Sequence, residues 1–272
     1  MNSLYRELAP ISDAAWEEIR TEAQQTLKRT LAARRLVDCG DPHGWGASSV
    51  DLGRSQVLEE APRTGVEARR RAVQPMLEIR VPFELARSEV EAIDRGARDG
   101  DLQPVIDAAR NAAMTEDSCI FYGYSAGQIT GICEAAAAES LALTSDYTRY
   151  PDVVAEAVNR LRMASVDGPY AIALGPRCYT GLTQTREGGY PVIEHVRRLV
   201  EGPIVWAPAA DGALVVSLRG GDFELTLGQD FSIGYLDHTA SAIHLYVQES
   251  FTFLVNTPEA AIPLRYPADA RQ

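Results

Sequence analysis

Residues 219–235 read RGGDFELTLGQDFSIGY and hold the clearest structural pattern in the chain. Phe223, Leu225 and Leu227 alternate with polar residues, which is the period of a strand with one buried face. A Gly-Gln-Asp segment then interrupts the pattern before a second short apolar stretch, 231–235. This arrangement predicts two paired strands joined by a turn, and it carries no obvious catalytic group.

Far upstream of this pattern, the sequence predicts a long first helix that begins after Ser12. Ser12 is a suitable N-cap, and Ile11 and Trp16 occupy the two positions of a hydrophobic staple. Apolar residues then recur every three or four positions as far as Leu31, which gives the helix one apolar stripe.

The rest of the chain divides into segments of different character. Residues 47–75 form a long polar extension with little core of its own, which is uncommon inside a compact monomer. A strand at 76–85 and a helix from about 104 to 122 follow. Residues 123–217 alternate between predicted helices and strands and indicate an α/β lobe, whereas 218–272 are rich in strands.

The composition is that of a globular protein, with 272 residues, 46% of them hydrophobic, and a formal net charge of −12. Because phosphate binding needs clustered Lys and Arg, this charge argues against nucleic acid as a partner. No apolar window has the length of a membrane span, and the first residues lack the apolar core of a signal peptide. We therefore expect a cytoplasmic protein that binds neither nucleic acid nor membrane.

Cysteine and histidine residues form no recognisable metal or disulfide pattern. The four cysteines are widely spaced without a C-x-x-C pair, and the four histidines include no H-E-x-x-H motif. We therefore expect reduced thiols, no metal site and no cofactor.

Six further blocks accompany the opening stretch: LYRELAPISDAAWEEI (4–19), LAARRLVD (31–38), GDPHGW (40–45), EDSCIFYG (116–123), DGPYAIAL (167–174) and ESFTFLV (249–255). Together with the block at 219–235, they resemble encapsulins, the linocin-type family 1 shell proteins of bacterial nanocompartments. Several separated blocks in one order are far more specific than any single short motif. The resemblance extends over nearly the whole chain.

The resemblance implies an α+β fold of the tailed-phage major-capsid type, with a peripheral (P) domain, an axial (A) domain and an extended loop (E-loop). The implied ranges are an N-terminal helix and arm of the P-domain at 1–46, the extended loop at 47–75, the P-domain with its long helix at 76–122, the A-domain at 123–217, and C-terminal strands of the P-domain at 218–272.

The resemblance also implies a protein with no chemistry of its own. Copies of the chain would self-assemble into a closed icosahedral shell, which we expect to have sixty subunits. The shell would enclose a cargo enzyme that carries a Gly-Ser-Leu-rich C-terminal targeting peptide, and it would admit small molecules through pores. A DyP-type peroxidase is expected as cargo in preference to a ferritin-like iron protein.

Cargo docking is implied on the inner face of the shell, along the first helix and the adjoining C-terminal strands. The expected apolar contacts are Leu27, Leu31, Leu36, Phe231, Ile233 and Tyr235. Arg34 and Asp38 are expected to orient the peptide. An alternative is that these two side chains only pair with each other at the end of the helix.

The loop TREGGY is expected to line a pore at the five-fold axis, where the axial lobe of encapsulins carries its pore loop. It comprises Thr185, Arg186, Glu187, Gly188, Gly189 and Tyr190. Each side chain would recur five times around the axis, so two charged residues would form charged rings. The alternative is a plain surface turn.

Two other functions remain open at this point. Ser125 lies in a G-x-S-x-G motif, and Asp222 or Asp230 with His238 or His244 would complete the chain order of a serine hydrolase or peptidase. A non-assembling, bacteriocin-like binding protein is the second alternative.

Overall fold

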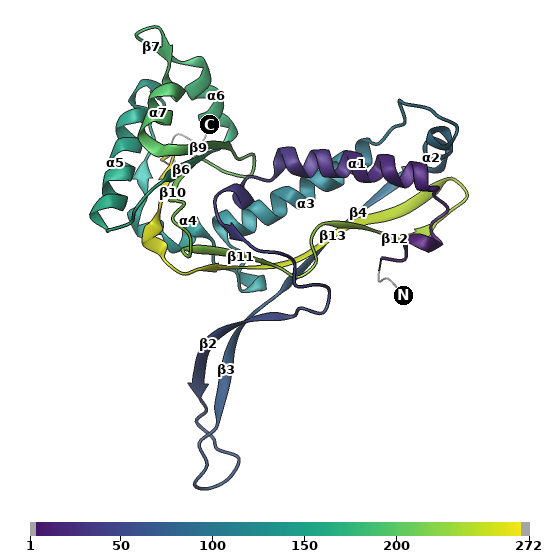
Figure 1. Ribbon diagram of the computed structural model, residues 1–272, viewed down its shortest axis with the longest axis horizontal. Helices are drawn as coiled ribbons and strands as arrows, with labels where there is room; N and C mark the ends of the chain where they lie inside the picture. The colour runs from purple at the N-terminus through teal and green to yellow at the C-terminus, as the bar shows by residue number, and fades with distance from the viewer. Residues whose placement is uncertain (1–3, 268–272) are drawn as a thin grey trace.

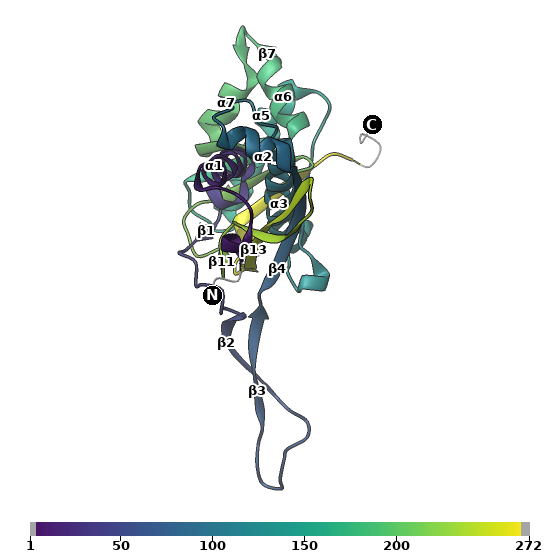
Figure 2. The ribbon, with the colours of Figure 1, turned by 90° about the vertical axis from the view of Figure 1, so that its right-hand side faces the viewer.

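The computed structural model describes residues 4–267 as two lobes and one projecting hairpin (Figure 1). The first lobe packs the long helices α1 (Asp13–Thr30) and α3 (Gln103–Tyr122) against a sheet. The second lobe adjoins the C-terminal end of α3. The hairpin of β2 (Ser49–Val57) and β3 (Arg69–Pro75) extends away from both lobes, as the perpendicular view of Figure 2 also shows. The mixture of helix and sheet confirms the predicted α+β class.

The sheet of the first lobe is organised around one long strand. Its strands are β1 (Asp38–Cys39), β4 (Leu77–Ala86), β11 (Phe223–Leu227), β12 (Ser232–His238) and β13 (Ala242–Val255). The long strand β13 pairs with β4 along one edge and with β11 and β12 along the other, all of them antiparallel. The short strand β1 runs parallel to β11 at the outer edge.

The predicted pairing of 223–227 with 231–235 is wrong. The strands β11 and β12 instead run end to end along the same edge of β13. Backbone bonds from Gly228 to Ser250 and from Ser250 to Gln229 continue the ladder between them. The chain therefore keeps the same direction through the Gly-Gln-Asp segment, which separates β11 from β12 without forming a reverse turn.

The two long helices form as their sequences predict. The Oγ of Ser12 accepts a hydrogen bond from the Ala15 N–H at 3.2 Å and caps α1. Trp16 and Ile19 on α1 are buried in the same cluster as Val105 of α3. The shorter helix α2 (Arg87–Asp94) follows β4 at the far end of this lobe.

The second lobe contains a five-stranded sheet in the order β5-β14-β10-β6-β9. Its strands are β5 (Leu141–Ala142), β6 (Tyr170–Leu174), β9 (Glu201–Trp206), β10 (Ala213–Ser217) and β14 (Ala261–Arg265). Its helices are α4 (Ile132–Ala135), α5 (Tyr150–Met163), α6 (Pro176–Gln184) and α7 (Val192–Val200). All five residues of both β6 and β10 are buried, as expected for central strands covered by helices.

The position of β14 corrects the implied range 218–272 for the P-domain. This strand pairs antiparallel with β10 and parallel with β5, so it belongs to the sheet of the second lobe. The chain therefore returns to that lobe after β13. The extreme ends of the implied P-domain, 1–3 and 268–272, lie outside the described residues.

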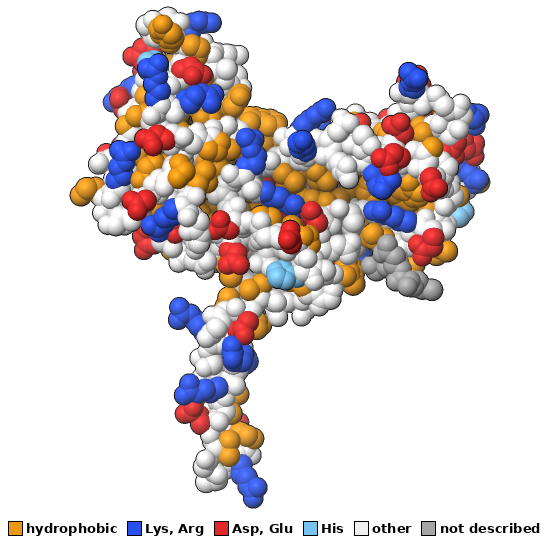
Figure 3. Space-filling model, in the orientation of Figure 1, with side chains coloured by type: hydrophobic (Ala, Val, Ile, Leu, Met, Phe, Trp, Pro, Cys, Tyr) orange, Lys and Arg blue, Asp and Glu red, His pale blue; other side chains and the backbone are white. Residues whose placement is uncertain are grey.

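The projecting hairpin coincides with the predicted extension at 47–75. Its strands pair from Ser49 with Pro75 to Val57 with Arg69, and most of its side chains are exposed. Several of the exposed side chains on β2, β3 and the segment between them are apolar: Leu52, Val57, Leu58, Val66 and Val73. Figure 3 shows such side chains along the hairpin. Their burial would require contact with another molecule.

Candidate functional site

A groove lies between α1 and the start of β12 in the first lobe. Its cavity has a volume of about 250 Å³. The lining residues are Arg6, Arg20, Ala23, Gln24, Leu27, Phe231, Ser232, Ile233 and Val247. We call this cavity the α1–β12 groove. Figure 3 shows hydrophobic side chains between the two elements, with basic side chains beside them.

Three of the predicted docking residues meet in this groove. Leu27 projects from α1, Phe231 directly precedes β12, and Ile233 lies near the start of that strand. Tyr235 packs against the same hydrophobic cluster without lining the cavity. Leu31 is half-buried at the C-cap of α1, also outside the groove lining. The role of these residues in docking stays a prediction.

Two other predicted docking residues lie elsewhere. Leu36 is only 2% exposed and packs into the hydrophobic core shared with the second lobe, so a peptide cannot contact it in this conformation. Asp38 is exposed and accepts a hydrogen bond from the Gly221 N–H at 2.6 Å. It lines a separate hollow between the two lobes, together with Ser217 and other residues.

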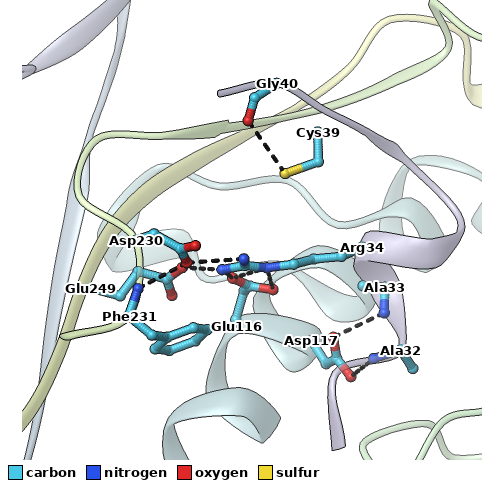
Figure 4. Close-up of polar contacts among 10 residues, drawn as sticks. All are labelled: Ala32, Ala33, Arg34, Cys39, Gly40, Glu116, Asp117, Asp230, Phe231 and Glu249. Atoms are coloured by element: carbon cyan, nitrogen blue, oxygen red, sulfur yellow. Dashed lines mark hydrogen bonds and ion pairs between the residues drawn. The ribbon is translucent and has the colours of Figure 1, made fainter. Parts of the chain in front are cut away.

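Arg34, the remaining predicted contact, is enclosed by carboxylates (Figure 4). Its Nε donates to both oxygens of Glu116 at 3.0 Å, and its Nη1 donates to Asp230 at 2.9 Å. Its Nη2 donates to Glu116 at 2.6 Å and also to Glu249. The alternative that Arg34 pairs with Asp38 is therefore wrong, since its guanidinium group is used elsewhere. We call Arg34, Glu116, Asp230 and Glu249 the Arg34 cluster.

The Arg34 cluster supports one wall of the groove. The guanidinium carbon of Arg34 lies 5.0 Å from the centroid of the Phe231 ring, within the range of a cation–π contact. Asp230 precedes Phe231 and accepts a hydrogen bond from its N–H at 2.8 Å. Arg34 thus holds the Phe231 ring in place. Its hydrogen bonds are to side chains of the same chain, so it is not available to orient a peptide in the way predicted.

The cluster buries two carboxyl groups beside one cation. The side chains of Glu116 and Glu249 are fully buried, whereas Asp230 is exposed. Burial, followed by the neighbouring Glu116, raises the pKa of Glu249 well above its ordinary value. Arg34 opposes this increase in pKa but does not cancel it. The protonated form of Glu249 is therefore favoured relative to a carboxyl group in water.

A further buried carboxyl group fixes the chain just before the cluster. Asp117 accepts hydrogen bonds from the Ala32 N–H at 2.9 Å and the Ala33 N–H at 3.0 Å. These bonds tie the 3₁₀ helix η2 (Ala33–Arg35) to α3. Burial raises the pKa of Asp117 to about 7 despite both bonds.

The residues of the predicted pore loop all lie together at the outer end of the second lobe (Figure 1). β7 (Arg186–Glu187) and β8 (Tyr190–Pro191) form a short hairpin. Gly188 and Gly189 connect the strands with φ values of 57° and 89°, which glycine adopts without strain. Thr185 is the C-cap of α6 and leads into the hairpin. The predicted pore role is not tested by this geometry.

The side chains of the hydrolase alternative do not assemble into a triad. Ser125 lies in a short 3₁₀ turn after α3, and no strand leads into it as in a nucleophile elbow. The proposed partners are engaged elsewhere: Asp222 with Arg219, Asp230 with Arg34, His238 with Tyr235, and His244 with Asp237. The geometry gives this alternative no support.

Residues 4–267 contain no group of three or more His, Cys, Asp or Glu side chains arranged to hold a metal ion. No helix in the same range is both long enough and apolar enough to cross a membrane.

Sequence reasoning missed several parts of the groove and its support. Arg6 lines the groove from the N-terminal segment, and Arg20 lines it from the middle of α1. Glu116 and Glu249 hold Arg34 although they are 133 residues apart in the chain. Both glutamates are the first residue of a block that resembles the family, and this resemblance was the one signal in the sequence that pointed to them. Their burial beside Arg34 became evident only from the fold.

Sequence comparison provides independent evidence on the family. The family model "Linocin_M18: Encapsulating protein for peroxidase" matches residues 1–252. The type 1 encapsulin shell protein of Rhodospirillum rubrum is 56% identical, covering 97% of each chain. The type 1 encapsulin shell protein of Mycobacterium tuberculosis is 47% identical, covering 98% of this chain and 100% of the relative.

Solved structures agree on the fold at much lower sequence identity. A virus-like particle from Pyrococcus furiosus matches with a TM-score of 0.62 and 16% identity, covering 90% of this chain and 97% of the other. The capsid of Myoviridae phage XM1 matches with a TM-score of 0.53 and 9% identity, covering 85% and 90%. The predicted phage-capsid fold is thereby confirmed. The chain belongs to the Linocin_M18 family of type 1 encapsulin shell proteins.

Proposed function

We propose that copies of this chain form a closed icosahedral shell of sixty subunits that encloses a DyP-type peroxidase. The shell works in the cytoplasm and has no catalytic step of its own. The cargo carries a C-terminal targeting peptide, which docks in the α1–β12 groove on the inner face. The family description, an encapsulating protein for peroxidase, supports this choice of cargo over a ferritin-like protein.

The observation that carries the assembly proposal is the large exposed surface of the single chain. Its accessible surface is 14471 Å². A compact monomer of this mass, 29.6 kDa, exposes ~11,600 Å² by the usual scaling with size. The excess accords with a two-lobed chain whose apolar hairpin side chains need another copy to cover them. Contacts between several copies would bury this surface in the shell.

The groove supports the docking proposal through its shape and lining. Leu27, Phe231 and Ile233 present an apolar surface beside backbone and polar groups of β12. A small apolar cavity with a few polar groups suits the side chains of an extended peptide. Because the Arg34 cluster fixes Phe231, the wall is formed before any peptide arrives.

Cargo loading tests the docking proposal directly. The shell protein is co-expressed with a peroxidase that carries its C-terminal tail, and co-purifying peroxidase is quantified per shell. Leu27→Asn should reduce loading at least about tenfold, because the tail loses apolar contact in the groove. The control is Leu236→Asn, the same substitution at an exposed site on β12 outside the groove.

The pore proposal assigns the β7–β8 hairpin to the five-fold axis. Arg186 and Glu187 are exposed at the outer end of the second lobe, and fivefold repetition would make rings of opposite charge. Small charged molecules would then cross a strong local field on their way to the enclosed enzyme.

A further inference from the structure

Two arginine side chains lie side by side at the edge of the α1–β12 groove. Arg6 comes from the 3₁₀ helix η1 (Arg6–Leu8), and Arg20 comes from the middle of α1. Both also line a second hollow of about 470 Å³ near the start of α1, together with Ile11 and Trp16. The arginine pair therefore stands between two adjoining hollows, each with an apolar part.

The position of Arg6 is fixed by its own contacts. Its Nε donates to the carbonyl oxygen of Ile233 at 2.6 Å. Its guanidinium carbon lies 5.6 Å from the ring centroid of Trp16. These contacts hold the half-buried cation at the rim of the groove, directly beside the β12 backbone.

The charge of Arg6 lacks a carboxylate partner among residues 4–267. The ion pair of Arg20 is with the exposed Glu17, on the preceding turn of α1. Burial and the charge of Arg20 both lower the pKa of Arg6, so the two cations oppose each other. Glu7 and Asp13 line the second hollow as well, but both are exposed, and neither forms an ion pair with Arg6.

We propose that the groove selects a peptide that places a carboxylate between Arg6 and Arg20 while apolar side chains occupy the hollows on either side. This inference rests on the proposed docking function and adds the charge that the groove requires. A carboxylate would receive charge-assisted hydrogen bonds from two guanidinium groups and would relieve their mutual repulsion. It can be an Asp or Glu side chain of the cargo tail or the terminal carboxylate of the cargo.

The test uses four fluorescein-labelled peptides of three Gly-Ser-Leu repeats. The central serine is replaced by Asp or by Asn, and the C-terminus is either free or amidated. Each peptide is mixed with dissociated shell protein before reassembly, and the peptide retained per shell is measured after gel filtration. The wild-type protein is compared with Arg20→Gln and with the control Arg29→Gln, an exposed α1 residue that lines neither hollow.

A carboxylate-bearing peptide should be retained about tenfold more than the amidated Asn peptide, and less so at high salt. Arg20→Gln should abolish this advantage, whereas Arg29→Gln should preserve it. The amidated Asp peptide and the free Asn peptide identify which source of carboxylate is used. Equal retention of all four peptides would overturn the charge requirement but leave docking intact. Retention of none of them would contradict the docking function as well.

Discussion

Arg34 supports the wall of the α1–β12 groove through its contacts with Phe231 and with three carboxylates. The guanidinium group joins Glu116 on α3 and Glu249 on β13, and it lies over the Phe231 ring. One side chain of η2 is thereby connected to the helix and the strand that support the groove. In the proposed docking, Arg34 is a positioning residue that acts through Phe231.

Replacing Arg34 should destabilise the fold, because the buried side chains of Glu116 and Glu249 would lose their positively charged partner. We expect Arg34→Gln to lower the free energy of unfolding by about 3–5 kcal/mol. The neighbouring Arg35 is exposed, so Arg35→Gln should change stability by less than about 0.5 kcal/mol. Thermal and denaturant unfolding of both variants checks this difference. Equal stability of the two variants would contradict the structural role of the cluster.

The buried carboxyl groups also predict how stability depends on pH. Both Glu249 and Asp117 have a pKa raised above the ordinary value in the folded chain. Such groups stabilise the fold at low pH, and this contribution is lost as the pH rises through the folded pKa. For Asp117 the loss runs from its ordinary pKa of 3.8 to about 7.

Calorimetry over a series of pH values above the ordinary glutamate pKa of 4.5 can isolate the contribution of Glu249. The melting temperature of the wild-type protein should fall with rising pH, and that of Glu249→Gln should fall less, because a side-chain amide does not titrate. The control is Glu224→Gln, since Glu224 is exposed on β11. A wild-type slope in the opposite direction, or a Glu249→Gln slope equal to that of the control, would refute the raised pKa of Glu249.

The sequence predicted the apolar side of the groove better than its charged side. Leu27 belongs to a helical stripe and Phe231 to an apolar stretch, so their patterns already indicated an inward direction. Leu36 has the same apolar character but is buried in another cluster. The partners of Arg34 could not be inferred, because charge pairing depends on the tertiary packing of α3 against β13.

At the scale of elements, local signals identified helices and strands but left strand partners undecided. The Ser12 cap and the apolar stripe predicted α1 correctly. Alternation along β11 indicated which side is buried, yet it carried no information on the neighbouring strand. A side chain at Gly228 would approach Ser250 Oγ to 2.5 Å, so this glycine permits close contact with β13 where a turn had been predicted.

Removal of the β2–β3 hairpin should prevent assembly of the shell while the rest of the chain still folds. Replacing 50–74 by Asn-Gly should leave the helical content nearly unchanged, because this segment contributes no residue to the hydrophobic clusters. Closed shells should no longer form, since neighbouring copies lose the contacts of the hairpin. Circular dichroism and electron microscopy measure the two effects.

A milder change provides the control for the hairpin deletion. Arg71→Gln removes only an exposed ion pair with Asp51 and should still give shells. Normal shells from the deletion variant would show that the hairpin is not needed for assembly.

The β7–β8 hairpin makes a separate prediction about transport. Arg186→Gln with Glu187→Gln should alter the rate and the salt dependence with which a small charged substrate reaches an enclosed peroxidase, while assembly stays normal. The control neutralises the Arg197 and Glu194 pair, which is exposed on α7 in the same lobe. Unchanged kinetics, under conditions where entry limits the rate, would remove the hairpin from the transport role.

At the scale of the whole molecule, the fold explains why the chain should work as one of many copies. Two lobes share a continuous core, while the hairpin extends away from both of them, uncovered by the other residues of 4–267 (Figures 1 and 2). A closed assembly lets one chain satisfy different contacts on several sides at once. The relatives from R. rubrum and M. tuberculosis are themselves named as shell proteins.

Electron microscopy of the chain expressed alone tests the central claim most directly. The protein should form hollow, closed particles of uniform size, with a mass by native mass spectrometry that corresponds to sixty subunits. Closed particles with another number of subunits would correct the size of the shell but preserve its function. A uniform population of monomers or dimers at micromolar concentration would contradict the account.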